Sequence, residues 1–547
     1  MKNYPYYRTD QYDHFRAFVD GIAVKYRSAP AISTYSPAGE IATRTYEEMA
    51  SDIHALAEYL YERGLAGEHM AIISHNSYMS VVAFLAIVIA GGVAVPLDTD
   101  QMPGVIGDML AFADTRLVLI SEDMLERYED TDVIDEARTL ILSGDAALED
   151  GLHRALARGR ELIAERGRLC PEIPIDPNQT AAIVYTSGTT SSSKAVMLSH
   201  TAMLLNASGS TELIKFPPRI FTSLPLYHAY GLTCALINNL INGAEICING
   251  DIRYMMRDFS LFKPTGLMAV PLIADMLCKI LVNHMDPQEC AGNDFISLVK
   301  RTFSGAEGAN SKCVAAKEKI MPGFELLLCG GAHLSPRVAK TLNTFGVTVI
   351  EGYGITECAP LISANRNEYY KWGTAGVALP SYELKFEDGE ILVRGKCLMN
   401  GYYKQEDLTR EVMADGWFRT GDLGYRDSRG FLTITGRKKN TIVLKNGKKV
   451  APEELEACLA AIPLVKESMV YGSALGNDMD DVVPAVTIYP DPTEAKGMNS
   501  YEILRKLQSE VNAINENLPA FKQIRIVNIR EEEFEKTSTK KIKRTVH

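Results

Sequence analysis

The sequence predicts an α/β protein with a large N-terminal domain and a small C-terminal domain. Three observations support this prediction: apolar and helix-like segments alternate as far as residue 354, closely spaced strands follow, and the last hundred residues differ in charge. The 547 residues exceed what one hydrophobic core holds, since single cores stop growing near about 250–300 residues. The composition, 46% hydrophobic and 23% charged, is that of a folded globular protein.

The first hundred residues alternate between helix and strand. Residues 46–64 carry apolar side chains at helical spacing and end at a glycine, which predicts a helix. Residues 69–74 and 92–97 predict short buried strands. The apolar segment 81–97 is broken by two glycines and a proline, so we interpret it as a buried helix and a strand rather than a transmembrane span.

Further apolar segments end in Gly, Pro or a polar loop and predict strands at residues 181–185, 219–226, 266–271, 325–331 and 347–354. Strands separated by helices favour parallel sheets, in which ligands bind at the carboxyl ends of the strands. We therefore expect the functional site in the loops that follow these strands.

The pattern changes between residues 376 and 436, where short strands and turn signals predict a barrel-like β subdomain. Asp388-Gly389 is a typical hairpin turn. A strand, a basic turn and a helix follow, and Pro452 lies early in that helix. We place the domain boundary here, so that residues 1–436 form the large domain and residues 437–547 the small α+β domain.

Charge is distributed unevenly between these domains. The formal net charge is −12; residues 437–547 hold 18 Lys and Arg against 16 Asp and Glu, so the small domain carries +2 and the large domain −14. This acidic total disfavours a nucleic-acid partner but is compatible with small anions bound by local basic residues. The N-terminus has no apolar signal segment and no cysteines form a C-x-x-C pair, so we expect a cytoplasmic protein with reduced thiols.

The segment YTSGTTSSSKAVMLSH, residues 185–200, predicts a phosphate-binding loop. A buried strand leads into small hydroxylated residues around Gly188, the loop ends in Lys194, and a helix is expected to begin near Ser199. Backbone N–H groups, hydroxyls and a lysine suit a phosphate chain. The Walker pattern is excluded, since Ser193 and Ala195 stand where it requires Gly and Ser or Thr. An ordinary Ser/Thr-rich surface loop is the alternative.

Two downstream motifs suit a nucleotide as well. In EGYGITE, residues 351–357, Tyr353 could stack on a purine and Glu357 could bind Mg²⁺ through oxygen. In TGD, Asp422 is suited to ribose hydroxyls, and Arg437 follows at a short interval. Each motif alone also fits a simple turn.

Together and in this order, the motifs resemble the adenylate-forming superfamily of acyl-CoA synthetases, stand-alone adenylation enzymes and luciferases. The similarity extends over essentially the whole chain and includes LPLYHAYGL (224–232), CGGAHL (329–334), GWFRTGDLG (416–424), GRKKNTIVLKNGKKVAPEELE (436–456) and EKTSTKKIKR (535–544). The segment 436–456 is most similar to bacterial long- or medium-chain fatty acyl-CoA synthetases. The resemblance implies stacked α/β sheets that bind AMP, and a small domain that moves between reaction steps.

The resemblance also implies the residues of an ATP and Mg²⁺ site. Those expected around the phosphates, adenine and ribose are Thr186, Ser187, Gly188, Thr189, Thr190, Lys194, Gly330, Gly331, Ala332, Glu351, Gly352, Tyr353, Gly354, Asp422 and Arg437. Thr186 and Glu357 match residues near Mg²⁺, and Thr356 matches the residue that contacts the α-phosphate. Lys541 matches the C-terminal catalytic lysine.

The acyl and CoA sites follow from the same resemblance. The acyl pocket is implied to be lined by His228, Tyr230, Gly231, Val270, Gly330, Tyr353 and Gly354. Lys439 matches the hinge of the small domain, and CoA is expected beside Lys445, Gly447, Lys448 and Lys449. We interpret His228 as a gate between acyl and thiol sites rather than a general base, because a carboxylate is already ionised at neutral pH.

The chain departs from the family pattern at several positions. Ser191, Ser193 and Ala195 replace the usual Gly, Pro and Gly of the phosphate loop, and Lys540 replaces a Gly before the catalytic lysine. We expect an altered loop conformation rather than lost binding, because the replacing loop residues are small.

The implied reaction is ATP-dependent activation of a carboxylic acid, in particular a fatty acid, to acyl-AMP, followed by thioester formation with CoA. Lys541 would bridge the substrate carboxylate and the phosphate, where electrostatic stabilisation is the main requirement. Loading of a carrier-protein phosphopantetheine is the alternative function, and a luciferase-like oxygenase and a peripheral membrane contact stay open. Amino-acid activation is disfavoured because no Asp soon follows His228, and a catalytically dead binding protein is disfavoured by the intact motif residues.

Overall fold

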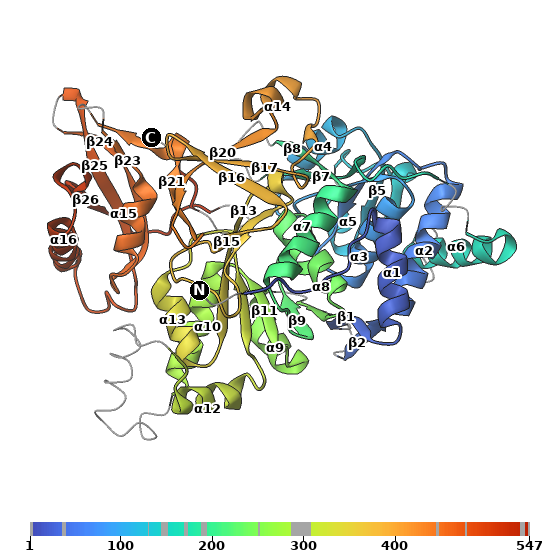
Figure 1. The fold of residues 1–547 in the computed structure, drawn as a ribbon, viewed down its shortest axis with the longest axis horizontal. Helices are drawn as coiled ribbons and strands as arrows, with labels where there is room; N and C mark the ends of the chain where they lie inside the picture. Colours follow the sequence, from blue (N-terminus) through green and yellow to red (C-terminus); the bar gives the residue numbers. More distant parts are fainter. Residues whose placement is uncertain are drawn as a thin grey trace.

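The computed structural model describes residues 4–35, 40–128, 131–143, 151–168, 173–186, 194–249, 252–285, 308–444, 448–475, 478–536 and 542–544. Within them, two large mixed sheets share a core of helices and carry further helices on their outer faces. A smaller antiparallel sheet follows, and the C-terminal residues form a separate group of elements at one end of the molecule (Figure 1). The predicted α/β class with a large and a small part is confirmed.

The first sheet has the order β18-β8-β7-β4-β3-β5-β6. The five strands from β7 to the edge strand β6 are parallel, and β8 and β18 continue the sheet antiparallel on the other side. The strands are β3 (His69–Ile73), β4 (Val93–Pro96), β5 (Thr115–Ile120), β6 (Thr139–Ile141), β7 (Thr180–Tyr185), β8 (Ala195–Ser199) and β18 (Gly401–Tyr402).

The second sheet has the order β15-β14-β13-β12-β11-β9-β10-β1-β2, with antiparallel strands only at its two edges. The strands are β1 (Pro30–Tyr35), β2 (Ile41–Thr45), β9 (Arg219–Thr222), β10 (Glu245–Ile248), β11 (Gly266–Ala269), β12 (Leu326–Cys329), β13 (Thr348–Gly354), β14 (Leu361–Ala364) and β15 (Val377–Ala378). Strand β9 ends before the predicted residue 226, because the side chain of Thr222 accepts the N–H of Leu224 and turns the chain.

Helices that belong to one core with residues of both sheets are α1 (Phe15–Tyr26), α2 (Tyr46–Glu62), α3 (Tyr78–Ile89), α7 (His200–Leu213), the π-helix η3 (Tyr230–Ile237) and α8 (Asn238–Ile241). Helix α3 is apolar on all sides, as expected for a helix buried on all sides. It contains the predicted buried helix, and no helix in the described ranges is both long and apolar enough to cross a membrane. Helix α7 begins where the sequence predicts, with Ser199 as its N-cap.

The outer faces carry the remaining helices of the large part. Those on or near the second sheet are α9 (Met255–Phe262), α10 (Pro271–Asn283), α12 (Ser311–Ile320) and α13 (Pro336–Thr344); those on the first are α4 (Pro103–Phe112) and α5 (Glu122–Glu126). Helix α6 (Leu152–Arg166) packs against α2 instead. Short 3₁₀ turns are η1 (Glu136–Arg138), η4 (Ile252–Tyr254) and η5 (Thr356–Cys358).

The predicted barrel-like subdomain forms a five-stranded antiparallel sheet. Its described strands pair in an open order, β16-β17-β20-β19, with β21 beside β20. The elements are β16 (Tyr382–Glu387), β17 (Glu390–Gly395), α14 (Glu406–Val412), β19 (Met413–Ala414), β20 (Trp417–Arg426) and β21 (Leu432–Arg437). The predicted hairpin turn is confirmed: Asp388 and Gly389 both have positive φ between β16 and β17.

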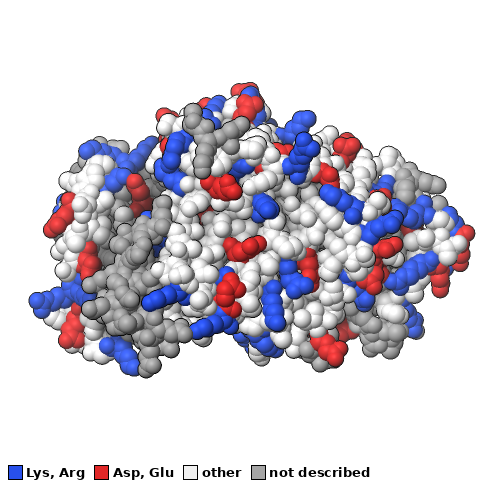
Figure 2. Space-filling model, turned by 60° about the horizontal axis from the view of Figure 1, so that its bottom comes forward, with Lys and Arg blue, Asp and Glu red and all other residues white. Residues whose placement is uncertain are grey.

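The C-terminal part has its own hydrophobic core. Its elements are η6 (Lys438–Asn440), β22 (Ile442–Val443), β23 (Lys449–Val450), α15 (Pro452–Leu459), β24 (Val465–Leu475), β25 (Asp478–Pro490), α16 (Ser500–Glu516), η7 (Ala520–Lys522) and β26 (Ile526–Ile529). Pro452 begins α15, as the sequence predicts. Figure 2 shows a face on which basic and acidic side chains are interspersed rather than gathered into one basic area.

Candidate active site

Four of the predicted site residues lie at or just after the carboxyl ends of parallel strands. Thr186 follows β7, Val270 follows β11, Gly330 follows β12, and Tyr353 lies near the end of β13. Gly331 and Ala332 are exposed, so the end of β12 opens to solvent. This arrangement places the sequence motifs where parallel α/β sheets bind ligands.

Asp422 is held between two other predicted residues. Asp422 on β20 faces Arg437 on β21, and its Oδ1 lies 2.8 Å from Arg437 Nε. The hydroxyl of Tyr353, which comes from β13, donates to Oδ2 of Asp422 at 2.7 Å. Asp422 is only 3% exposed. The structure therefore brings together three predicted ATP-site residues and fixes both oxygens of the carboxylate.

Electrostatic interactions connect this group to Glu357. The charge of Asp422, with a smaller contribution from Glu357, raises the pKa of Arg437. Burial and then Asp422 raise the pKa of Tyr353 well above its ordinary value of 10, so its hydroxyl stays protonated and donates. Glu357 thus lies within electrostatic reach of the Asp422–Arg437 pair.

Glu357 and Lys194, both predicted, meet at a residue that was not predicted. The hydroxyl of Tyr402 donates to Glu357 Oε1 at 2.8 Å and accepts from Lys194 Nζ at 3.3 Å. The N–H of Thr186 donates to the carbonyl of Lys194 at 3.0 Å, so the two ends of the predicted phosphate loop are joined. A tyrosine in a two-residue strand carries no sequence signal for such a position.

A buried amide holds the turn that carries Thr356 and Glu357. Asn206, inside α7 and 0% exposed, donates to the carbonyls of Cys358 at 2.9 Å and Leu361 at 2.7 Å. Its Oδ1 accepts the N–H of Leu361 at 3.2 Å. Asn206 was also missed, although a polar residue on a buried helix face is a detectable signal, because a buried amide must find partners.

Three residues of the implied acyl pocket, Tyr230, Val270 and Gly330, lie at the ends of β11 and β12. The hydroxyl of Tyr230 lies 3.3 Å from the carbonyl oxygens of both Ala269 and Leu328. Its ring lies 3.2 Å from where a Cβ on Gly330 would be, and a Cβ on Gly331 would lie 3.6 Å from Val270 Cγ1. The lack of a side chain at residue 330 therefore makes room for Tyr230.

Gly231 has a packing requirement of its own. A Cβ on Gly231 would lie 2.0 Å from the carbonyl oxygen of Pro225, so only glycine allows this approach. The Pro225 carbonyl also accepts the N–H of His228 at 3.2 Å, and the His228 ring lies 4.7 Å from that of Tyr227, centroid to centroid. Packing of the loop that carries His228 is sufficient to account for this glycine.

Glu351 is a buried residue of β13, two residues before Tyr353. Burial raises the pKa of its carboxyl to about 8, although the backbone N–H of Gly373 opposes the shift. Its Oε1 has no hydrogen-bond partner among the residues the structure describes. The carboxyl is therefore mostly protonated at neutral pH, and Glu351 can donate a hydrogen bond.

We expect Glu351→Gln to remove a pH dependence of stability. The folded-state pKa lies above the ordinary value of 4.5, so the free energy of unfolding falls with rising pH between about 4.5 and 8, by at most about 1.4 kcal/mol per pH unit. In urea denaturation, the free energy of unfolding of the variant should rise relative to that of the wild type between pH 6 and pH 8. Glu325→Gln, at an exposed residue, is the control; a wild-type–variant difference that is constant with pH contradicts the assignment.

The predicted hinge residue lies between contacts to both parts of the chain. Lys439 is exposed in η6; before it, Lys438 Nζ lies 2.9 Å from Glu390 Oε2 of β17, and after it, Asn440 Nδ2 donates to Glu453 Oε1 of α15 at 2.6 Å. Rotation about residue 439 would move these two contacts apart.

Other predicted residues are placed only in part. Lys448 Nζ lies 4.4 Å from the centroid of the Phe521 ring, and Lys449 is exposed in β23. Several predicted or departing residues lie outside the described residues: Ser187, Gly188, Thr189, Thr190, Ser191, Ser193, Lys445, Gly447, Lys540 and Lys541.

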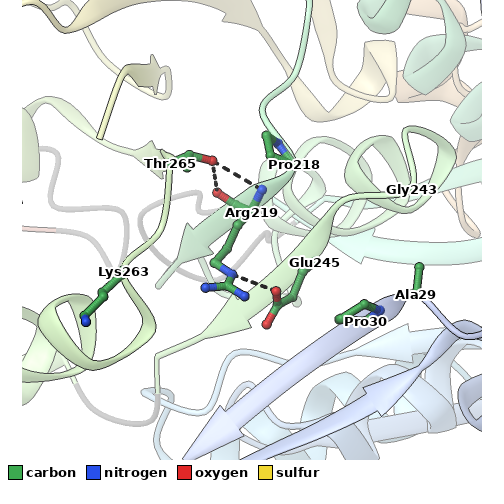
Figure 3. A pocket seen from close by; sticks show the side chains of 8 residues that line it. All are labelled: Ala29, Pro30, Pro218, Arg219, Gly243, Glu245, Lys263 and Thr265. Carbon is green, nitrogen blue, oxygen red and sulfur yellow. Dashed lines mark hydrogen bonds and ion pairs between the residues drawn. The ribbon is translucent and has the colours of Figure 1, made fainter. Parts of the chain in front are cut away.

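A cavity at the amino-terminal ends of strands β9 and β10 is separate from this site. Figure 3 shows it beside Arg219 and Glu245, the first residues of β9 and β10. Arg219 Nε lies 2.7 Å from Glu245 Oε2, and the hydroxyl of Ser33 donates to Glu245 Oε1 at 2.6 Å. Both oxygens of the Glu245 carboxylate have hydrogen-bond partners, so a structural role accounts for the Arg219–Glu245 ion pair.

Comparisons with known proteins cover both parts of the chain. Residues 19–403 match the family model "AMP-binding enzyme", and residues 439–547 match "AMP-binding enzyme C-terminal domain". The long-chain-fatty-acid–CoA ligase FadD15 of Mycobacterium bovis is 30% identical over 466 residues, which cover 79% of this chain and 75% of FadD15.

Two solved structures show the same fold. The anthranilate CoA ligase AuaEII with anthranoyl-AMP superposes with a TM-score of 0.76 at 18% identity, covering 99% of this chain and 96% of AuaEII. The o-succinylbenzoate CoA synthetase MenE of Bacillus subtilis, with ATP and a magnesium ion, gives a TM-score of 0.71 at 21% identity and covers 96% of this chain and 98% of MenE.

Proposed function

Because the chain belongs to the AMP-binding enzyme family, we propose that it activates a carboxylic acid with ATP and transfers the acyl group to CoA. In this reaction a carboxylate oxygen bonds to the α-phosphorus, the α–β phosphoanhydride bond breaks, and pyrophosphate leaves. The CoA sulfur then attacks the acyl carbonyl, and AMP leaves. The observation that carries the proposal is the Tyr353–Asp422–Arg437 group beside the Glu357–Tyr402–Lys194 group.

The residues of the two groups fit a nucleotide. Asp422 can accept hydrogen bonds from ribose hydroxyls, since each carboxylate oxygen keeps an acceptor position beside its protein partner. Lys194 and the N–H groups of the phosphate loop suit the phosphate chain. Thr356 lies in the same turn as Glu357, which suits its proposed contact with the α-phosphate.

Glu357 offers an oxygen ligand for Mg²⁺, with Thr186 as the second proposed metal-site residue. No cluster of three or more His, Cys, Asp and Glu that could hold a metal ion occurs within the described ranges. Mg²⁺ in nucleotide sites is bound by one or two carboxylates plus phosphates, so a single Glu357 carboxylate is sufficient. When bound, Mg²⁺ would neutralise charge on the leaving pyrophosphate.

A fatty acid is the proposed substrate class. The similarity to FadD15, whose name gives a long-chain fatty acid, supports it. The π-helix η3 that follows His228 is buried from Gly231 to Ile237 and carries no charged residue. Such a wall is suited to an alkyl chain and offers no carboxylate for an α-amino group.

We propose that the small domain, residues 437–547, rotates between adenylation and thioester formation, with Lys439 as the hinge. Within that part, Arg544 binds both Glu456 and the carbonyl of Val470, so Arg544 is anchored to the small domain. His228 is proposed as the gate, and Lys445, Gly447, Lys448 and Lys449 as the CoA-binding turn. A cytoplasmic location remains part of this proposal.

The substrate and acceptor can be tested in two assays. Pyrophosphate release, measured over saturated acids from acetate to stearate and over benzoate, should depend on added acid and rise at least tenfold from acetate to the best fatty acid. Thioester formation should then occur with CoA. Highest activity with benzoate would overturn the fatty-acid assignment, and acylation of a holo carrier protein without any acyl-CoA would establish the alternative acceptor.

A further inference from the structure

We infer that Tyr402 is a positioning residue of the adenylation site. Its hydroxyl keeps the Glu357 carboxylate and the Lys194 ammonium apart and holds each of them in place. The inference rests on the proposed function and goes beyond it, because it assigns to the β18 tyrosine a control over how strongly Mg²⁺ supports ATP binding and adenylation.

The hydroxyl of Tyr402 serves both neighbours in complementary roles. It donates its single proton to Glu357 Oε1 at 2.8 Å, and its oxygen accepts from Lys194 Nζ at 3.3 Å. The ammonium of Lys194 also lies 4.8 Å from the centroid of the Tyr402 ring, within the range of a cation–π contact. A carboxylate and an ammonium are thus joined through one phenol.

The backbone around Tyr402 is tied to the two segments that its side chain connects. Strand β18 pairs with β8, where Tyr402 faces Val196, two residues after Lys194. The N–H of Met399, three residues before Tyr402, donates to the carbonyl of Glu357 at 2.9 Å. The N–H of Tyr402 itself donates to Thr409 Oγ1 at 2.9 Å. The hydroxyl therefore has little freedom to leave its place.

The hydroxyl is also shielded from solvent. Tyr402 is 2% exposed, so its hydroxyl is held between the Glu357 carboxylate and the Lys194 ammonium.

Removing the hydroxyl would change the carboxylate in two ways. Glu357 would lose the donor that orients it, and Lys194 would be able to approach Glu357 directly and compete with Mg²⁺ for its charge. Outer partners of metal ligands typically change metal affinity or activity by about 10- to 100-fold when they are removed. We therefore expect Tyr402→Phe to raise the Mg²⁺ concentration for half-maximal pyrophosphate release about tenfold or more.

Tyr403→Phe is a matched control on the next residue. The hydroxyl of Tyr403 donates to Asp114 Oδ2 at 2.7 Å, on a different part of the surface. Each variant keeps an aromatic ring and loses one hydrogen bond to a carboxylate. Tyr403→Phe should leave the Mg²⁺ requirement within twofold of wild type. An unchanged Mg²⁺ requirement in Tyr402→Phe would overturn the inference.

A binding measurement gives a readout besides activity. Calorimetric titration of ATP with and without Mg²⁺ should show that Mg²⁺ strengthens ATP binding to the wild type and to Tyr403→Phe. In Tyr402→Phe that gain should shrink about tenfold. An equal gain in all three proteins contradicts a positioning role, even if Tyr402→Phe melts at a lower temperature.

A double variant tests whether Tyr402 acts through Glu357. If it does, adding Tyr402→Phe to Glu357→Gln should lower pyrophosphate release by less than twofold, because coupled residues are not additive. Multiplied effects would mean that Tyr402 does not act through Glu357 and would overturn its proposed control of the Mg²⁺ requirement. If the wild-type protein releases no pyrophosphate with any acid, the proposed function is refuted. That result is distinct from a failure of the Tyr402 inference, which concerns the variants.

Discussion

Replacing Asp422 with alanine should lower kcat/KM for ATP at least 100-fold. Asp422 is buried and its two oxygens are oriented by Tyr353 and Arg437, so it is prepared to accept both ribose hydroxyls. Hydrogen bonds to a charged group contribute about 1.5–3 kcal/mol each, and two such bonds at the lower value, about 3 kcal/mol, correspond to about 100-fold. Pyrophosphate release at varied ATP concentrations measures the effect.

The analogue 2′,3′-dideoxy-ATP shows whether this loss concerns the ribose. Wild type should prefer ATP to the analogue by a large factor, and Asp422→Ala should lose that preference. Asp427→Asn is the control, because Asp427 lies in the same β20–β21 hairpin and binds Lys371 and two backbone N–H groups of its own turn. A preference for ATP that survives in Asp422→Ala would show that another group reads the ribose.

Lys541→Ala should lower the adenylation step at least 100-fold while ATP still binds. A positive group placed between two reacting anions stabilises the transition state, and loss of one such group typically costs about 100- to 1000-fold in rate. Transfer of the acyl group from synthetic acyl-AMP to CoA should change less than threefold, because the small domain is expected to remove Lys541 before that step. Acid-dependent pyrophosphate release and thioester formation from acyl-AMP measure the two steps separately.

Lys540→Ala is the matched control for this variant. The two lysines are adjacent, and spacing to Ile542, Lys543 and Arg544 favours Lys541 as the catalytic residue. Lys540→Ala should retain most adenylation. Unchanged adenylation in Lys541→Ala, with a large loss in Lys540→Ala, would transfer the role to Lys540.

The strand ends of the site could be predicted from sequence because they depend on local patterns. Apolar segments followed by glycine or polar loops placed Thr186, Gly330 and Tyr353 at the carboxyl edges of parallel strands, as the structure confirms. The Asp422–Arg437 pair was within reach of sequence for a similar reason, since both residues lie in adjacent strands of one hairpin.

Residues that join distant segments could not be predicted in this way. Tyr402 reaches Glu357 and Lys194 only because a two-residue strand joins the edge of the first sheet, and nothing in the local sequence specifies that long-range pairing. Asn206 holds the turn of Glu357 from a helix about 150 residues away in the chain. Likewise, the contact of Gly231 with the Pro225 carbonyl depends on a backbone approach that composition does not reveal.

The fate of the carboxylate oxygens tests the central claim most directly. We would incubate the protein with Mg²⁺, ATP, CoA and a fatty acid labelled with ¹⁸O in its carboxylate, and analyse the products by mass spectrometry. Attack on the α-phosphorus predicts one ¹⁸O atom in AMP and none in pyrophosphate. Label in inorganic phosphate with formation of ADP, or unlabelled AMP beside acyl-CoA, would contradict adenylate formation.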